Sequence, residues 1–231
     1  MTYLGNEGLP RILTGTDGLQ LPDVLRGLAK QRPLFHSEAD FKHALAWEIQ
    51  GRFPHAEVRL EVPLSDRRER LDMLVRVDGT TYALELKYKT RGITFELAGE
   101  KIQVRDQGAP DTGRYDFLKD LGRLERFVAQ GFDRIGYAVL LSNDPYYWSH
   151  SRRKNINVEF FLYEGRRIPR NRKMNWAAHA SDGSVGKRIP LSVNGIYICK
   201  WQDYSMLPNL PLTVSAFRYL LLRAAKPLAL C

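Results

Sequence analysis

Cysteine is nearly absent from this chain, since Cys199 and Cys231 are the only two among 231 residues. One lies in an apolar run and the other is the last residue, so they suggest neither a disulfide framework nor a zinc site. We find no apolar run long enough to cross a bilayer and no signal-peptide pattern. We therefore expect a cytoplasmic protein that does not act on membranes.

Several catalytic motifs are also missing. The sequence has no His-rich metal cluster, no nucleophile elbow and no Gly-rich phosphate loop. It has no internal repeat and no low-complexity tract. A metal-dependent hydrolase acting on something other than nucleic acid is therefore the least favoured class.

Acidic residues are too few to balance the basic ones. Lys and Arg number 35 against 26 Asp and Glu, so the formal charge is +9 and the pI about 9.6. This excess favours a polyanionic partner, namely nucleic acid, although a protein can also be basic without binding one. The oligomeric state stays open between a monomer and a homodimer.

Length and composition predict one domain with a sizeable core, because 44% of the residues are hydrophobic and 26% are charged. We divide this single domain, residues 1–231, into three parts. Residues 1–36 form an N-terminal extension, 37–145 the expected catalytic core, and 146–231 a C-terminal elaboration with a basic segment.

The most informative stretch is a predicted β-hairpin over residues 70–89. Two apolar-rich runs flank Asp78 and Gly79. An Asp-Gly pair is a strong signal for a two-residue hairpin turn, because both positions adopt positive φ. With that turn as the loop, the register places Asp72 directly opposite Glu85.

Alternation assigns the hairpin side chains to two faces. The apolar face contains Leu71, Met73, Val75, Val77, Tyr82, Leu84, Leu86 and Tyr88. The polar face contains Asp72, Glu85, Lys87 and Lys89. Opposed carboxylates repel each other, and such hard oxygen ligands suit Mg²⁺. Two interpretations stay open, a metal site with Lys87 beside it or an ordinary solvated polar face.

Asp72 followed by Glu85-Leu86-Lys87 resembles the signature of the PD-(D/E)XK nuclease superfamily, which has the restriction-endonuclease-like fold. Leu71 stands at the position of the name-giving Pro. The resemblance implies that Asp72 and Glu85 are catalytic and hold Mg²⁺ or Mn²⁺. It also implies that catalytic Lys87 positions or helps to deprotonate the attacking water and stabilises the transition state.

A helix is predicted from the N-cap Ser37 to about Gly51, and Glu48 lies on or beside its apolar stripe. In the resembled family, such an N-terminal helix often supplies a further acidic residue to the metal site. Glu48 is therefore a candidate catalytic residue and metal ligand. The alternative is a carboxylate at the edge of the stripe, paired with Arg52 or with water.

The remaining pattern predicts an α/β (α+β) fold with a central mixed sheet flanked by helices. A strand over 56–63 precedes the hairpin, and a smaller hairpin follows it. A helix ends by Gly131, with Asp120 to Arg123 and Arg126 on its outside. The run Ile135–Leu141 is apolar enough for a central strand covered on both faces. We expect a restriction-endonuclease-like core with extra C-terminal strands and a final helix over Thr213–Ala224.

Basic residues gather between 151 and 173, after the aromatic run Tyr146-Tyr147-Trp148. Such a composition suits a nucleic-acid surface, and a solvated basic hairpin is the alternative. The candidate nucleic-acid-binding residues are Lys89, Arg152, Arg153, Lys154, Arg166, Arg167, Arg170, Arg172 and Lys173.

The sequence thus favours a Mg²⁺-dependent nuclease that hydrolyses phosphodiester bonds, with DNA as the expected substrate and endonucleolytic cleavage as the expected mode. The alternative is a non-catalytic nucleic-acid-binding protein on the same fold. The sequence does not distinguish DNA from RNA or reveal sequence specificity.

Overall fold

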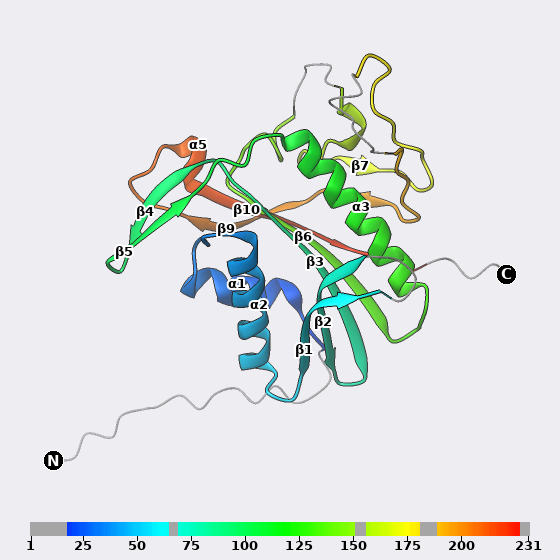
Figure 1. The fold of residues 1–231 in the computed structure, drawn as a ribbon, viewed down its shortest axis with the longest axis horizontal. Coiled ribbons are helices and arrows are strands. Elements are labelled where there is room, and N and C mark those ends of the chain that lie inside the picture. Colours follow the sequence, from blue (N-terminus) through cyan, green and yellow to red (C-terminus); the bar gives the residue numbers. More distant parts are fainter. Residues whose placement is uncertain (1–17, 65–68, 151–155, 181–188, 227–231) are drawn as a thin grey trace.

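The computed structural model describes residues 18–64, 69–150, 156–180 and 189–226. Its centre is a six-stranded mixed sheet in the order β1-β2-β3-β6-β10-β9 (Figure 1). These strands are β1 (Glu57–Pro63), β2 (Arg70–Val77), β3 (Thr80–Lys89), β6 (Arg134–Ser142), β9 (Trp201–Met206) and β10 (Ala216–Arg223). Neighbouring strands are antiparallel except β3 and β6, which are parallel. The predicted mixed sheet is confirmed.

Helices cover both faces of the sheet. On one face, α1 (Leu21–Gln31) and α2 (Glu38–Arg52) contribute to a core with the apolar side chains of β2 and β3. On the other face lies α3 (Pro110–Val128), which packs on β3 and β6 (Figure 1). Side chains of β6 and β10 enter the cores on both faces of the sheet, which accounts for the nearly continuous apolar sequences of these strands.

Local sequence explains where α2 begins and how it packs. The Ser37 side chain accepts a hydrogen bond from the Asp40 backbone N–H at 3.1 Å and so caps the helix. Phe41 is fully buried beside Phe35 and Tyr88. The Tyr88 hydroxyl donates to the Phe35 carbonyl at 3.0 Å, so this large side chain is buried without leaving its polar atom unpaired. Each such buried aromatic side chain stabilises the fold by about 1.5–3 kcal/mol.

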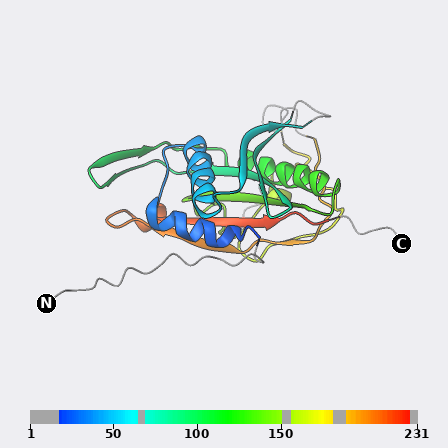
Figure 2. The same ribbon diagram turned by 90° about the horizontal axis from the view of Figure 1, so that it is seen from below.

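Segments between β3 and β6 form the crossover that makes these strands parallel. The chain leaves β3 through the hairpin of β4 (Ile93–Leu97) and β5 (Glu100–Val104), which projects beyond the rest of the molecule (Figure 2). It then enters α3 and returns as β6. Gly136 of β6 lets α3 approach closely, since an added Cβ would lie 3.0 Å from Cβ of Leu124.

The C-terminal part of the chain differs from the prediction. The expected final helix over Thr213–Ala224 is wrong, since only the short α5 (Leu212–Ser215) is helical before β10 begins. β10 lies between β6 and β9, so these two strands of the C-terminal part complete the central sheet. A short run of apolar residues buried on all sides has no distinguishing periodicity, and its neighbours decide whether it forms a helix or a strand.

Many of the described residues between β6 and β9 pack on the α3 side of the sheet. This part of the chain contains the 3₁₀ turn η1 (Val158–Phe160) and a small two-stranded sheet of β7 (Arg167–Ile168) and β8 (Tyr197–Ile198). Phe160, Leu162 and Ile168 are fully buried and extend the core around α3.

Candidate active site

The hairpin of β2 and β3 has the predicted turn and register. Asp78 and Gly79 form the turn with φ values of 49° and 74°. The pairing runs from Val77 opposite Thr80 to Met73 opposite Leu84. The next positions in this register are Asp72 and Glu85, and the two carboxylates are close enough for Asp72 to raise the pKa of Glu85.

Backbone pairing between β2 and β3 ends at Met73. Beyond that point, carboxylate side chains instead of backbone carbonyls accept hydrogen bonds from the N–H groups of β3. Asp72 Oδ2 accepts a hydrogen bond from the Leu86 backbone N–H at 2.8 Å. Glu38 Oε2 of α2 accepts one from the Tyr88 N–H at 2.9 Å. The free edge of β3 is therefore lined with carboxylates, while its other edge pairs with β6.

The apolar face of the hairpin is confirmed with one exception. Met73, Val75, Tyr82, Leu84, Leu86 and Tyr88 pack with α1 and α2. Leu71 packs instead with Leu74 on the α3 side. Regular alternation does not extend to Leu71 because β2 no longer pairs with β3 there, and Asp72 turns toward the edge of β3.

α3 contributes two charged residues that the sequence analysis assigned to its outside. Arg123 Nη1 donates to Glu85 Oε1 at 2.6 Å, and Arg123 Nη2 lies 2.9 Å from Asp120 Oδ1. Lys87 Nζ lies 2.7 Å from Asp120 Oδ2. The expectation that Asp120 and Arg123 face solvent is wrong. Three residues apart, they lie on one face of α3, and that face meets the polar side chains of β3.

α2 closes the site from the opposite side. Lys42 Nζ lies 3.1 Å from Asp72 Oδ1 and also contacts Glu61 of β1. Glu61 has a φ of 53°, in the left-handed region that residues other than glycine rarely adopt. Glu61, whose backbone is strained, therefore pairs with the same lysine, Lys42, as Asp72 does.

Burial and like charge strongly perturb the acidic residues. Burial, together with the nearby carboxylates of Asp120 and Asp72, raises the pKa of Glu85 to about 9, and Arg123 opposes the shift. Burial also raises the pKa of Asp120, against the effect of Lys87 and Arg123. These acids are close enough to repel one another, which makes the cluster an attractive place for a cation.

Nearby carboxylates favour the charged form of Lys87. Burial disfavours its charged form, but the carboxylates of Asp120, Glu38 and Asp72 outweigh burial and raise the pKa of Lys87. Its ammonium is therefore held in the protonated form at neutral pH. A residue in that state stabilises negative charge and is poorly suited to accept a proton.

The donor atoms at this site fit a divalent cation in kind. Asp72, Glu85 and Asp120 offer carboxylate oxygens, the ligands that Mg²⁺ prefers. Asp120 Oδ2 is buried without a hydrogen bond of good geometry, although Lys87 lies close to it. Across the described residues, no three His, Cys, Asp or Glu side chains are already arranged to hold a metal ion. The carboxylates form ion pairs instead, Asp72 with Lys42, and Glu85 and Asp120 with Arg123.

Glu48 does not join this cluster. Its Oε1 accepts from Arg52 Nε at 2.7 Å, and its Oε2 accepts from Gln31 Nε2 of α1 at 3.2 Å. The structure therefore supports the alternative that Glu48 pairs with Arg52, and we correct its assignment as a metal ligand and catalytic residue. The α2 carboxylate at the site is Glu38, one turn before Lys42.

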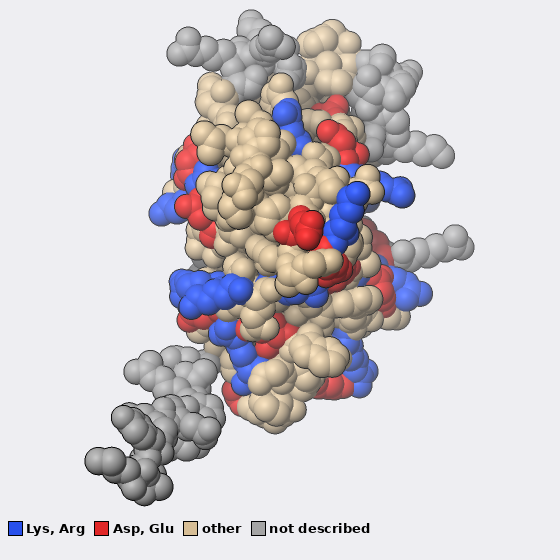
Figure 3. All heavy atoms as spheres, turned by 90° about the vertical axis from the view of Figure 1, so that its left-hand side faces the viewer, with Lys and Arg blue, Asp and Glu red and all other residues tan. Residues whose placement is uncertain are grey.

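The predicted nucleic-acid-binding residues have different surroundings. Arg152, Arg153 and Lys154 lie outside the described residues. Lys89, half-buried, has its Nζ 4.0 Å from Glu38. Arg167 and Lys173 are exposed. On the face shown in Figure 3, Lys and Arg side chains are interspersed with Asp and Glu and form no continuous basic patch.

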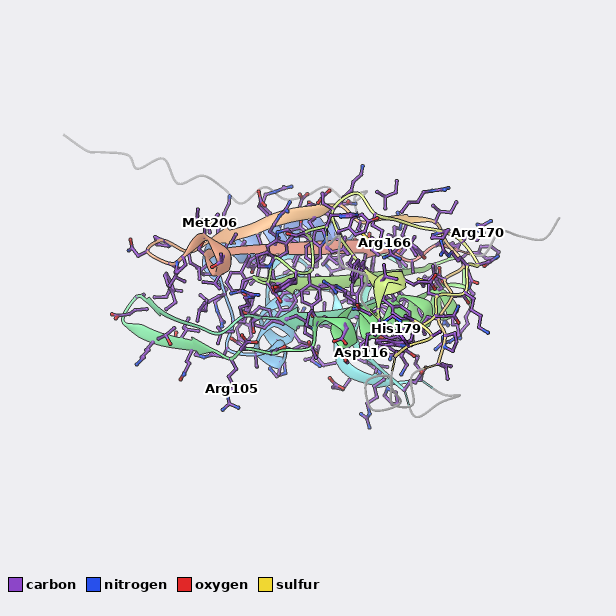
Figure 4. The ribbon with its side chains drawn as sticks, turned by 90° about the horizontal axis from the view of Figure 1, so that it is seen from above. Arg105, Asp116, Arg166, Arg170, His179 and Met206 are labelled. Atoms are coloured by element: carbon purple, nitrogen blue, oxygen red, sulfur yellow. The ribbon has the colours of Figure 1, made fainter. Side chains whose placement is uncertain are left out.

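Three arginines of the basic segment make intramolecular contacts. Arg166 Nη1 donates to the Val158 carbonyl at 2.9 Å, and Arg170 Nε donates to the Asn194 carbonyl at 2.8 Å. Arg172 pairs with Glu159 at 2.8 Å. Figure 4 shows Arg166 and Arg170 among the C-terminal loops. These contacts connect neighbouring loops, so the three arginines have structural partners that the sequence did not reveal.

No signal in the sequence marked Asp120, Arg123, Lys42 or Glu38 as site residues. Each lies on a helix among other charged residues, and only the packing of that helix on β3 distinguishes it.

No helix within the described ranges combines the length and apolar character needed to cross a membrane. No family model, curated protein or solved structure matches this chain.

Proposed function

We propose that this protein is a Mg²⁺- or Mn²⁺-dependent nuclease that hydrolyses phosphodiester bonds, with DNA as the substrate and internal cleavage as the mode. The observation that carries the proposal is the gathering of Asp72, Glu85 and Lys87 at the free edge of β3. A hairpin that only stabilised the fold would gain little from a buried Glu85 close to the half-buried Asp72, because like charges repel.

The architecture supports the same proposal. A helix, a strand and the site-bearing hairpin precede a crossover helix and a parallel strand, in a mixed sheet with helices on both faces. This order agrees with the core expected for a restriction-endonuclease-like fold. Likeness of fold is only an analogy for activity, so the residues of the site carry more weight.

Each site residue has a role that its surroundings suit. Asp72, Glu85 and Asp120 would hold the cation. When bound, a divalent cation activates water and neutralises charge on a phosphate. Lys87, kept protonated by Asp120, would stabilise negative charge that develops on the phosphate oxygens. Of the two roles first considered for Lys87, charge stabilisation is favoured over proton abstraction.

One observation favours the alternative of a non-catalytic nucleic-acid-binding protein. Lys42 already neutralises Asp72, and Arg123 already neutralises Glu85. A site with built-in counter-ions can persist without a metal. The two functions differ in cleavage, not in binding, so a single assay separates them.

The test incubates purified protein with supercoiled plasmid, linear duplex and single-stranded DNA, each in Mg²⁺, Mn²⁺ or EDTA. We expect conversion of the plasmid to nicked and linear forms in either metal and none in EDTA. Glu85→Gln should remove the activity, and Glu48→Gln serves as its control on a carboxylate outside the cluster. Binding without cleavage in all metals would support the non-catalytic alternative.

A further inference from the structure

Arg123 is the most highly connected cation of the site. Its guanidinium reaches Glu85 at 2.6 Å, Asp120 at 2.9 Å and Glu69 at 3.8 Å. These carboxylates belong to β3, to α3 itself and to the segment just before β2. Arg123 therefore binds the carboxylates that a divalent cation would need.

Docking of α3 does not depend on this ion pair. Phe117, Leu121 and Leu124 are fully or almost fully buried and pack in the core on the α3 side of the sheet. Taking a guanidinium and two carboxylates out of water costs free energy, and apolar residues of similar size often stabilise a fold equally well. The ion pairs of Arg123 are thus better explained by the chemistry of the site than by stability.

The existing ion pairs indicate what a cation would change. Glu85 and Asp120 already have Arg123 as an ionic partner, and Asp120 also has Lys87. A divalent cation that binds these carboxylates competes with the guanidinium for the same oxygens. A guanidinium displaced in this way needs another anion, and a phosphate is one that it binds well.

We propose that Arg123 exchanges partners when the site binds a divalent cation, leaving Glu85 and Asp120 and binding a phosphate of the nucleic acid. A guanidinium is suited to this exchange because it forms paired hydrogen bonds with either a carboxylate or a phosphate. Its side chain is 13% exposed, against 2% for Glu85 and 6% for Asp120, so it is the most accessible of these three ion-paired residues. The inference rests on the proposed function and adds a coupling between metal and substrate.

The exchange requires that cation binding and nucleic-acid binding strengthen each other, because each ligand favours the same position of Arg123. Removing the charge of Arg123 should uncouple them. The carboxylates would then bind a cation more tightly, since no internal counter-ion competes, while the cation would no longer improve binding of nucleic acid.

Arg123→Met tests this, since it keeps the length of the apolar stem and removes the charge. Arg126→Met is the matched control: Arg126 lies on the same helix and also pairs with Glu69, at 2.9 Å, but its other hydrogen bond is to the Gly122 carbonyl and not to Glu85 or Asp120. The first measurement is Mn²⁺ affinity by electron paramagnetic resonance without nucleic acid. We expect Arg123→Met to bind Mn²⁺ about tenfold more tightly than the unaltered protein, the scale on which one nearby cation alters the proton affinity of a carboxylate.

The second measurement is fluorescence anisotropy with a labelled duplex oligonucleotide, in Ca²⁺ and in EDTA. The unaltered protein and Arg126→Met should bind more tightly in Ca²⁺, and Arg123→Met should lose that gain. Arg123→Lys, which retains charge but not the paired donors, should recover part of it and serves if the Met variant does not fold.

Two negative results have different meanings. Mn²⁺ affinity and Ca²⁺-dependent binding that are unchanged in folded Arg123 variants would overturn the role of Arg123 and leave the proposed nuclease untouched. An unaltered protein that binds neither Mn²⁺ nor the oligonucleotide would overturn the proposed function and the partner exchange together.

Discussion

Asp72 Oδ2 accepts a hydrogen bond from the Leu86 backbone N–H at 2.8 Å. The contact lies just past the last backbone pair of β2 and β3, where a carboxylate takes over from a backbone carbonyl. A main-chain donor therefore orients Asp72, and its other oxygen is left to Lys42. Backbone geometry prepares this residue for the site before any ligand binds.

The first prediction concerns the carboxylates. Asp72→Asn and Glu85→Gln should each abolish metal-dependent plasmid cleavage, because an amide oxygen carries no charge to hold a divalent cation. Both variants should stay folded, since they keep the size of the side chain. Gel assays across Mg²⁺ and Mn²⁺ concentrations measure the effect. Cleavage at the unaltered rate by both variants would place the active site elsewhere.

The second prediction concerns stability. Lys87→Ala should destabilise the fold by about 3–5 kcal/mol, because it leaves the Asp120 carboxylate buried without its ammonium partner. Lys89→Ala, two residues further along β3, should cost about 0–1 kcal/mol, since its nearest acidic atom is 4.0 Å away. Urea unfolding of the two variants compares them. An equal loss of unfolding free energy in the two variants would show that the ion pair of Lys87 with Asp120 contributes no more to stability than a surface ion pair.

The third prediction is a dependence of stability on pH. The pKa of Glu85 is about 9 in the folded chain, against an ordinary value of 4.5, so the folded state retains a proton that the unfolded state releases. The contribution of this group to stability is complete below the unfolded pKa and is lost as pH rises through the folded pKa.

Urea midpoints in EDTA should therefore fall as pH increases across that window, and Glu85→Gln should reduce the slope. A Glu85→Gln protein with the slope of the unaltered chain would mean that Glu85 is not the group responsible.

The fourth prediction concerns the exposed basic residues. Neutralising Arg167 and Lys173 to Gln should weaken binding to every DNA sequence alike and flatten the salt dependence by about 0.9 in log–log slope per lost phosphate contact. Arg166→Gln should instead lower stability, because its guanidinium binds the Val158 and Glu159 carbonyls. Binding titrations at several salt concentrations provide the comparison. An unchanged slope in the double variant would identify its residues as solvated surface.

The same titration applied to neutralised Arg152, Arg153 and Lys154 tests the remaining part of the basic segment. Loss of binding without a change in slope would indicate an unfolded chain, which circular dichroism detects independently.

The fifth prediction tests the position of β10. Leu220→Ala should destabilise the fold by about 2–5 kcal/mol, because Leu220 is fully buried between β6 and β9. Leu212→Ala is the control, since Leu212 is 84% exposed at the start of α5 and its truncation should cost less than about 0.5 kcal/mol. Similar thermal stability of the two variants would contradict a buried central strand.

The sequence by itself determined the features that depend on residues close together in the chain. The Asp78-Gly79 turn sets the register of its own hairpin, so Asp72, Glu85 and Lys87 could be placed together without knowledge of any other element. The cap at Ser37 and the apolar stripe of α2 are equally local. Such features follow from backbone geometry and side-chain periodicity, which a short window of sequence contains.

Tertiary structure alone decided which charged residues surround that hairpin. Asp120 and Arg123 belong to the site because one face of α3 packs on the polar side chains of β3, whereas Glu48 turns toward α1 and Arg52. A charged residue on a helix has the same local pattern in water and beside a buried partner. The run that became β10 was equally ambiguous, because burial on both faces removes the periodicity that separates a strand from a helix. In each case, contacts between residues distant in sequence made the choice.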